Sequence, residues 1–539
     1  MTKVSGGAGG VAVGYQAGYH PTGNYNTWVG YNAGFGSNAA SSQAAYTNVG
    51  IGKEALMSIT NGYDNTAVGV LAGATLTTGY FNTYIGKAAG SGATTAAHSN
   101  VGIGLSALSS AHGANNVAIG RGALSSTIDA NQVAIGSSAL EANTSGEKNT
   151  AIGFQALEAN TTGNYNVAIG HEALESNVHG DGSVAIGYEA LATSTPDDNV
   201  GYSVGIGYQA LTASTTAHSN IAIGRQALDS VTAGSENVAI GTYAGQAYVG
   251  GAGTTGGFGV FIGHTAGYLV TGNGSYKSIT LVGHAAGYNA TGAQTSTGIG
   301  ASALYHADGA LNTTAVGRKA GYKDTGTGSV WVGDSAGHEI NGNYNVALGY
   351  GALSGASSGT GYGTAYNNVA VGKESLHNVS SGGDNVAMGI QAGYSLSTAT
   401  LNVLIGRQAG YGITTAQKSV VIGSNAGYAM AGQGGSVLVG FEAGRFQDAG
   451  SGGSVAIGHQ ALYSGTQNYQ DVAIGNNAGR KATGASASNV FLGRFAGPST
   501  AGVVQNKLYI HNDEGTPLIY GDFSAGKVGI NIDSPAAAL

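Results

Sequence analysis

Short apolar stretches alternate with polar, glycine-rich stretches along the whole chain, and the alternation is close to periodic. The recurring phrase is Asn-Val-Ala-Ile-Gly, then two variable residues, then Ala-Leu or Ala-Gly. We count positions in each copy from the glycine that ends the first half, called the anchor glycine. There are 28 anchors, and the 479 residues from Gly14 to Gly493 give about 17.7 residues for each of the 27 intervals. Internal repetition of this kind is typical of a solenoid.

The residues just before each anchor have the pattern of a β-strand. Position −3 is always β-branched, as in Val117, and position −1 is aliphatic or, at Met388, methionine. These two positions share one strand face, and the period of a helix is not visible. The pattern predicts an all-β chain, a parallel β-solenoid (β-roll) of about 28 coils of ~17 residues, each with two short strands and two turns. Stacked coils would bury the Val and Ile side chains as ladders.

Asparagine stands at position −4 in 15 copies, including Asn65, Asn82, Asn166 and Asn385. Stacked side-chain amides can hydrogen-bond from one coil to the next, as in cross-β ladders. Asparagine also suits a turn that precedes a strand. The two interpretations are compatible, and both stay open at this point.

Position −2 lies on the opposite strand face, which should be polar in a lone solenoid, yet it is never polar. It is Ala or Gly in most copies and bulky in nine. Both faces of the strand therefore look buried, which predicts a second packing layer. We expect this layer to be an interface between chains in a homotrimeric fibre. A dimer, or an arrangement with both layers inside one coil, also fits.

The volumes at positions −2 and +4 compensate. Position +4 is Leu in 13 copies, all with Ala or Gly at −2, and the nine bulky residues at −2 all occur with Gly at +4. The two positions therefore share one space of fixed volume, and Gly337→Leu should clash with Trp331. The residues predicted at the trimer interface are Trp28, Tyr84, Phe261, Leu281, Trp331, Leu404, Leu438, Phe491, Leu124 and Leu157.

From residue 11 to about residue 500, the repeated phrase resembles the head repeats of trimeric autotransporter adhesins. The resemblance implies a left-handed parallel β-roll in a homotrimer. The usual repeat of that family is shorter, so longer turns are expected here. The handedness comes from the resemblance and not from the spacing of the residues.

The stretch from Lys507 to Pro535 departs from the repeat and resembles the segment that precedes the endosialidase-type intramolecular chaperone of phage tail fibres. No chaperone follows Leu539, so we expect a cleavage product or a truncated chain. The expected organisation is an N-terminal lead-in (1–10), a β-roll shaft (11–500) and a C-terminal β segment (501–539). The resemblance implies an extracellular phage tail fibre for host attachment, and the alternative is a bacterial cell-surface trimeric adhesin.

The composition fits a regular fibre better than a set of globular domains. Glycine makes up 98 of 539 residues, proline only 5, and charged residues 9%, far from globular averages. A net charge of −8 argues against nucleic acid as a partner. No apolar run is long enough to predict a transmembrane helix, and Met1–Gly10 lacks the features of a signal peptide.

No arrangement of catalytic residues recurs, so we expect neither enzyme activity nor a cofactor. Paired carboxylates at a fixed offset, which glycoside cleavage needs, are not visible. Cysteine is absent, and four of the 13 histidines directly follow an anchor. Other residue types replace histidine at that position in most copies, so we expect no metal site. The four are His171, His264, His284 and His459.

Five long intervals place extra residues in the same turn of the coil, and loops on one face of a repeat scaffold often make contacts. Their tyrosines are candidates for contact with a host-surface glycan or protein, although solvated loops without a ligand fit equally. They are Tyr46, Tyr202, Tyr248, Tyr276, Tyr362 and Tyr366. Tyrosines that follow Ala-Gly, such as Tyr394, Tyr411 and Tyr428, are predicted to stack on one another for packing.

Overall fold

The computed structural model describes residues 8–36, 44–94, 97–195, 201–232, 234–248, 257–271, 278–355, 363–432, 434–447, 452–464, 469–483, 486–513, 515–532 and 535. Within them the chain is all-β, without a helix, and forms a parallel β-solenoid of about 27 turns spaced by about 17 residues. This confirms the predicted fold class, while the handedness and the homotrimer stay predictions. The chain divides into two compact units, residues 1–277 and 278–539.

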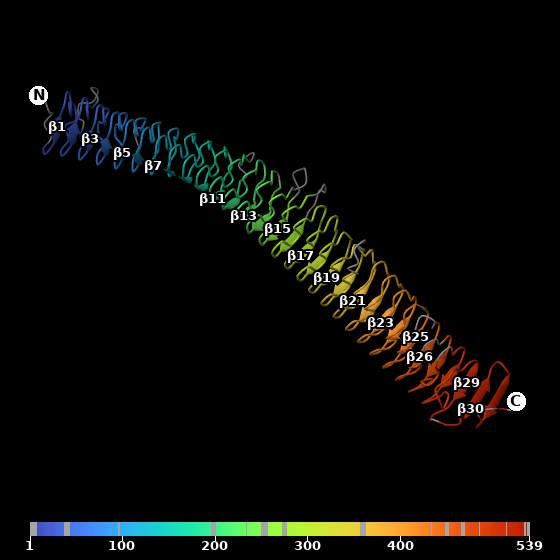
Figure 1. Cartoon of the computed structure of the whole chain (residues 1–539). Coiled ribbons are helices and arrows are strands. Elements are labelled where there is room, and N and C mark those ends of the chain that lie inside the picture. The colour runs from blue at the N-terminus through green and yellow to red at the C-terminus, as the bar shows by residue number, and fades with distance from the viewer. Residues whose placement is uncertain are drawn as a thin grey trace. The chain divides into compact units, whose positions relative to one another are not determined.

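In the first unit, blue to green in Figure 1, the strands stack as successive rungs. Each strand pairs in parallel with that of the next coil and in register, so that Val117 lies opposite Val133 and Ile119 opposite Ile135. Its strands are β1 (Val11–Val13), β2 (Thr27–Val29), β3 (Val49–Ile51), β4 (Thr66–Val68), β5 (Thr83–Ile85), β6 (Val101–Ile103), β7 (Val117–Ile119), β8 (Val133–Ile135), β9 (Thr150–Ile152), β10 (Val167–Ile169), β11 (Val184–Ile186), β12 (Val204–Ile206), β13 (Ile221–Ile223), β14 (Val238–Ile240) and β15 (Gly259–Ile262).

The second unit repeats this stacking and ends differently. Its parallel strands are β16 (Ile279–Val282), β17 (Thr297–Ile299), β18 (Thr314–Val316), β19 (Val330–Val332), β20 (Val346–Leu348), β21 (Val369–Val371), β22 (Val386–Met388), β23 (Val403–Ile405), β24 (Val420–Ile422), β25 (Val437–Val439), β26 (Val455–Ile457), β27 (Val472–Ile474) and β28 (Val490–Leu492). Next, β29 (Lys507–Ile510) pairs in parallel with β28. The strands β30 (Ile519–Asp522) and β31 (Lys527–Ile530) then follow in antiparallel order.

Among the described residues, a coil has one strand of three or four residues and not the two predicted strands. The rest of the coil is turns, with isolated bridges such as Tyr63 to Tyr80. The physical reason lies at positions +2 and +4, where Gln155 and Leu157 have φ of 54° and 51°. Left-handed residues bend the chain and cannot continue a strand.

Positions −2, +3 and +4 build the interior of each coil. Around Gly120, the side chains of Ala118, Ala123 and Leu124 are fully buried, whereas Val117 and Ile119 are only half-buried. The expectation that Val and Ile form the core is therefore wrong, because the alternation along the strand is right but the opposite face points inward. Close packing fills the interior with small residues at positions −2 and +3 together with Leu at +4, or with one bulky residue at −2 opposite Gly at +4.

The residues predicted at an interface between chains lie inside the single chain. The shared space is confirmed: a Cβ atom on Gly337 would lie 2.8 Å from Cζ3 of Trp331, and one on Gly205 would lie 3.2 Å from Cγ of Leu191. The layer formed by position −2, predicted at an interface between chains, thus lies within one coil. The corrected residues, all at most 4% exposed, are Trp28, Tyr84, Phe261, Leu281, Trp331, Leu404, Leu438, Phe491, Leu124 and Leu157.

Buried asparagines at position −4 form the predicted amide ladder. The Nδ2 group of Asn65 donates to Oδ1 of Asn48 at 3.0 Å, and that of Asn82 donates to Oδ1 of Asn65 at 2.9 Å. The same Asn48 oxygen accepts the backbone N–H of Asn65 at 3.0 Å, and Nδ2 of Asn65 also donates to the carbonyl of Gly79. The ladder satisfies amide groups that would be costly to bury without partners.

Asp471 occupies position −4 in its coil, and we expect Asp471→Asn to stabilise the neighbouring coils at neutral pH. Its Oδ1 accepts from N and Nδ2 of Asn489 at 2.8 and 2.9 Å, while Oδ2 is buried without a hydrogen-bond partner. Burial raises the pKa of Asp471 to about 6. The stability that a raised carboxyl pKa contributes is present below about pH 4 and is lost as the pH rises through 6.

At pH 7 the substitution should raise the local free energy of unfolding by about 1–3 kcal/mol. Amide hydrogen-exchange protection of β27 and β28, corrected for intrinsic rates, measures this local stability. The gain should shrink towards zero at pH 4. Asp384→Asn, at an exposed carboxylate of the same unit, is the control. Equal gains at both pH values would contradict a cost of burying charge.

Candidate functional site

A stripe of aliphatic and threonine side chains at positions −3 and −1 runs along the outer strand face of each unit. We call these residues of β1–β15 and of β16–β28 the apolar stripe. In β20, for example, Val346 is 37% and Leu348 is 48% exposed. Because successive strands pair in register, the exposed side chains form continuous columns within each unit. Monomeric soluble proteins rarely expose apolar surface of this extent.

The stripe ends in a hollow beside the hairpin formed by β30 and β31. This hollow has a volume of about 550 Å³, and Ile474, Leu492 and Ile510 line it together with Leu518. The first three belong to the column of position −1, which β29 continues beyond the last anchor. The column of position −1 therefore reaches this hollow, whose lining also includes His511, Asn512, Thr516 and Asn531.

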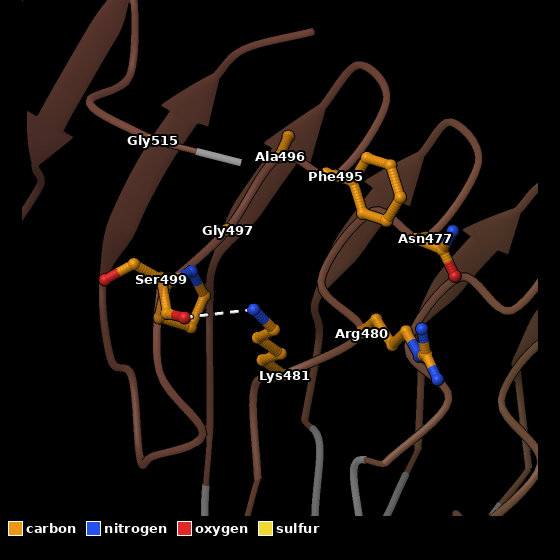
Figure 2. A pocket seen from close by; sticks show the side chains of 9 residues that line it. Asn477, Arg480, Lys481, Phe495, Ala496, Gly497, Ser499 and Gly515 are labelled. Atoms are coloured by element: carbon orange, nitrogen blue, oxygen red, sulfur yellow. Dashed lines mark hydrogen bonds between the residues drawn. The ribbon is translucent and has the colours of Figure 1, made fainter. Parts of the chain in front are cut away.

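A second, much smaller cavity lies in the same unit (Figure 2). Arg480, Lys481 and Phe495 line it, and Nζ of Lys481 donates to the carbonyl oxygen of Ser499 at 3.0 Å. Its volume of about 10 Å³ admits about one water molecule. It cannot hold a sugar ring, in spite of its cationic and aromatic lining.

The six loop tyrosines predicted to contact a receptor have different surroundings. Tyr202 and Tyr366 are exposed, and Tyr46 is exposed but stacks on Tyr63 with ring centroids 5.0 Å apart. Tyr248 is fully buried against Phe261, and burial raises the pKa of its hydroxyl to about 12. The prediction is therefore wrong for Tyr248, because its ring fills the interior of the coil. Tyr276 and Tyr362 lie outside the described residues.

The predicted tyrosine ladder is present at Tyr394, Tyr411 and Tyr428, whereas Tyr268 meets Tyr243 edge to face with ring centroids 6.3 Å apart. The rings of Tyr394, Tyr411 and Tyr428 stack with centroids 5.0 Å apart and planes within 10° of parallel. The spacing equals one coil, as expected for side chains in register. Stacking covers the faces of rings inside a ladder, so these rings cannot stack on a sugar.

Sequence reasoning missed three exposed tyrosines outside the long loops, Tyr25, Tyr165 and Tyr344. They are between 59% and 65% exposed, and each lies at position −5 in an identical Gly-Asn-Tyr-Asn segment. The three occurrences of that segment, all in intervals of ordinary length between anchor glycines, are the sequence signal by which these tyrosines could have been predicted. Tyr202 lies at the same position and is 60% exposed.

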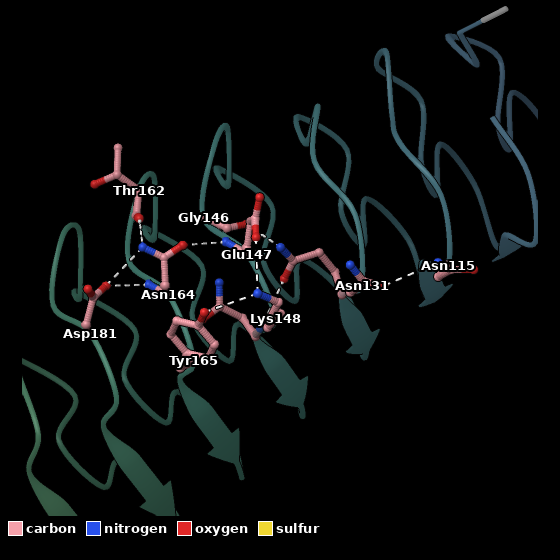
Figure 3. A network of polar contacts seen from close by, with 11 residues as sticks. Asn115, Asn131, Gly146, Glu147, Lys148, Thr162, Asn164, Tyr165 and Asp181 are labelled. Carbon is pink, nitrogen blue, oxygen red and sulfur yellow. Dashed lines mark hydrogen bonds and ion pairs between the residues drawn. The ribbon is translucent and has the colours of Figure 1, made fainter. Parts of the chain in front are cut away.

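Figure 3 shows how one of these tyrosines is held. Nζ of Lys148, in the preceding coil, donates to the hydroxyl of Tyr165 at 3.1 Å and lies 4.9 Å from the ring centroid. Oδ1 of Asn164 accepts the N–H of Glu147 at 2.8 Å, and Oδ1 of Asp181 accepts the N–H of Asn164 at 2.6 Å. These bonds fasten the backbone of three successive coils on either side of the ring.

Among the described residues, no group of three or more His, Asp or Glu side chains is placed to hold a metal ion. A search of the same residues for a helix with the length and apolarity of a membrane span finds none.

Comparison with protein-family models gives no match, and comparison with curated proteins gives no relative. The apolar stripe and the exposed tyrosines are therefore the features of the chain that bear on its function.

Proposed function

We propose that this chain is the shaft of a homotrimeric fibre with a passive role in attachment, in the first place a phage tail fibre that contacts a host surface. The apolar stripe carries this proposal. A solenoid that leaves two columns of Val, Thr, Ile and Leu half-exposed along each unit needs a partner to cover them. Further copies of the same chain supply the matching stripe at the same spacing.

Parallel copies in register would place stripe against stripe along their length. Such an interface would have an apolar centre, as obligate homo-oligomers do. The hollow at Ile474, Leu492 and Ile510 would then be filled by the same columns of the other chains. The number three comes from the resemblance to adhesin head repeats, since the stripe by itself requires only that it be covered.

The alternative is a bacterial cell-surface trimeric adhesin of the β-roll type, which the repeated phrase favours. The stretch from Lys507 to Pro535 favours the tail fibre, because it resembles the segment before the chaperone of such fibres. Both proposals place the protein outside the cell and assign it no catalysis. Each of the two resemblances implies a fibre, and they differ only in the kind of fibre that they favour.

The stripe is tested by the mass of the native particle from light scattering. We expect three times the 52.9 kDa of one chain. The variant Ile135→Gln, Ile152→Gln and Ile169→Gln places polar amides in three successive coils of the stripe. It should shift the particle towards the single-chain mass, because each amide would be buried without a partner.

Ile128→Gln with Phe446→Gln is the matched control, since both side chains are exposed but lie outside the stripe. It should leave the particle mass unchanged. A wild-type particle of single-chain mass would refute the fibre assembly, and twice the chain mass would replace the trimer by a dimer.

A further inference from the structure

Two exposed columns of residues border the apolar stripe, one at each end of its strands. Position +1 follows the C-terminal end of each strand, and we call the residues at position +1 the trailing rim. Position −5 precedes the N-terminal end of each strand, and we call the residues at position −5 the leading rim. Lys53 on the trailing rim and Asp64 on the leading rim are both exposed. The two rims are therefore accessible to whatever covers the stripe.

The trailing rim is strongly basic. It holds eight of the 19 lysines and arginines of the chain together with four histidines, and its only acid is Asp334. The leading rim instead holds three acids, Asp64, Glu236 and Asp384, and two lysines. The two sides of the stripe therefore differ in charge, and this difference gives the stripe a direction.

The acids of the leading rim occur only where the trailing rim is basic in both neighbouring coils. In six coils, the coil before and the coil after both carry Lys, Arg or His at position +1. All three acids fall in these six coils, and the other three have Ser99, Thr295 and Gln470 at position −5. The flanking pairs are Lys53 and Lys87 around Asp64, Arg225 and His264 around Glu236, and Lys373 and Arg407 around Asp384. Residue types that vary together indicate positions in contact.

This contact does not occur within one chain. A whole strand separates the two rims, and among the described residues none of the three acids forms an ion pair with a basic side chain. Oδ1 of Asp64 accepts the hydroxyl of Thr47 at 2.5 Å, and Oδ1 of Asp384 accepts from Nδ2 of Asn367 at 3.0 Å. Both donors belong to the leading rim, so they hold the carboxylates in place without neutralising their charge.

The lysines of the trailing rim remain accessible although they have acidic neighbours in their own coil. Nζ of Lys53 lies 3.6 Å from Oε1 of Glu54, but 58% of the lysine side chain stays exposed. Lys373 stands in the same way beside Glu374 and is 57% exposed. Ion pairs between exposed side chains are weak, so a second carboxylate that approaches from outside can compete for these lysines.

We propose that the two rims recognise each other between copies of this chain, with each acid at −5 of one copy lying between two basic residues at +1 of the next. The assignment rests on the fibre assembly proposed above and adds what fixes its direction. Parallel copies arranged around an axis along the stack bring the trailing rim of one copy against the leading rim of the next. An antiparallel pair would bring like rims together, and basic residues would face basic residues. The first unit carries the acids Asp64 and Glu236 and the second carries Asp384, so each unit has a direction of its own.

The pattern also selects the register between copies. Coils lie about 4.8 Å apart, so in-register copies place each acid level with an uncharged residue at +1 and one coil away from a basic residue on either side. The level residues are Val70, Thr242 and Ile390. A shift by one coil would bring one basic residue level with the acid and move the other to a distance of two coils, which leaves the symmetric pattern without a cause. Charge complementarity of this kind determines orientation and choice of partner more than affinity.

Reversing the charge of the leading rim tests the proposal. In Asp64→Lys with Glu236→Lys and Asp384→Lys, basic residues would face basic residues between parallel, in-register copies. The native particle is titrated with urea, and light scattering follows its mass. At low salt the association constant should fall at least tenfold. In about 0.5 M salt, where exposed charges are screened, the difference from wild type should shrink to below threefold.

Glu141→Lys with Glu175→Lys and Asp308→Lys is the matched control, because it makes the same change of net charge away from both rims. It should stay within threefold of wild type. The opposite effect is expected at Lys418, which lies on the leading rim one coil after Arg407, where the two like charges would repel between copies. Lys418→Glu should therefore raise the association constant at least threefold at low salt.

A short bismaleimide cross-linker tests the contact itself, since the chain contains no cysteine. Asp64→Cys with Val70→Cys places one thiol on each rim at the same level, and cross-linking should give covalently joined copies on a denaturing gel. Asp64→Cys with Ser137→Cys places the second thiol four coils further along the trailing rim. This pair should give single chains.

The particle mass separates this proposal from the fibre assembly. An assembled particle whose stability ignores the charge reversal, or whose copies do not cross-link through positions 64 and 70, overturns the rim pairing and leaves the assembly through the stripe standing. A wild type of single-chain mass refutes the assembly and the rim pairing together. A particle of two chains that cross-links through positions 64 and 70 overturns the trimer and retains the rim pairing.

Discussion

Gly337→Leu should unfold its region of the second unit, with a loss of at least about 4 kcal/mol. The new Cβ atom alone would lie 2.8 Å from Cζ3 of Trp331 and closer still to two other ring carbons. The indole is fully buried and donates through Nε1 to the buried carboxylate of Asp324 at 2.8 Å. The ring therefore cannot move aside without breaking that bond.

The shared space predicts that Gly337→Leu, which destabilises the wild-type protein, stabilises the Trp331→Ala variant. In the following coil, Leu353 and Ala347 are both fully buried and fill the equivalent space. Trp331→Ala should leave a cavity and remove the indole donor to Oδ2 of Asp324, whose Oδ1 still accepts the backbone N–H of Gly326. The expected loss is about 3–5 kcal/mol. Adding Gly337→Leu to Trp331→Ala should then restore part of the lost stability, since the leucine enters the vacated volume.

Thermal unfolding of the four proteins in this cycle measures the coupling between the two positions. Leucine at position 337 should lower the melting temperature beside Trp331 and raise it beside alanine. The effect should persist in released single chains, because both positions lie within one coil. Additive losses would contradict the shared space, whatever the state of assembly.

The repeat register could be predicted from the sequence almost residue by residue, because it depends on local chemistry. Val117 and Ile119 begin and end a strand as expected, and Asn65 takes part in the predicted ladder. Which of the two strand faces points into the coil could not be predicted in the same way. A period of two separates the faces but does not say which one points inward.

The column of alanines at position +3 indicates which side of the coil is the interior. A position restricted to alanine in 27 copies, with Ser375 in the other, marks a thin interior. Hydrophobicity alone predicts that the large aliphatic residues form the core, but much of a folded surface is also apolar, so a half-exposed valine or isoleucine is not excluded. Val117 and Ile119 face outward, where the proposed assembly would cover them.

The candidate contact residues were harder to predict for a different reason. Long intervals drew attention to Tyr46 and Tyr248, but a tyrosine in a loop can equally stack in a ladder or fill the coil, as these two do. Exposure depends on which residue lies one coil away. For Tyr344 that residue is Gly328, sixteen positions back in the sequence, and only the register of the coils brings the two together.

Gly389→Ala should be the most damaging of the small substitutions, with an expected loss of about 3–5 kcal/mol. This anchor glycine has a φ of 137°, a conformation that residues with side chains rarely adopt. A Cβ atom would also lie 2.5 Å from the carbonyl oxygen of Gly406, the anchor of the next coil. Because that oxygen belongs to the stacked backbone, relief would require the two coils to separate.

Gly309→Ala separates the two contributions. Gly309 also has a left-handed φ, of 80°, but a Cβ atom there would meet nothing within 4 Å. Its loss should be limited to the backbone term, roughly 1–2 kcal/mol. Hydrogen-exchange protection of β22 and β23 should collapse in Gly389→Ala, whereas that of β17 and β18, which flank Gly309 in sequence, should stay near wild type in Gly309→Ala. Equal losses in the two variants would show that conformation alone, and not the close approach of successive coils, requires glycine at the anchor.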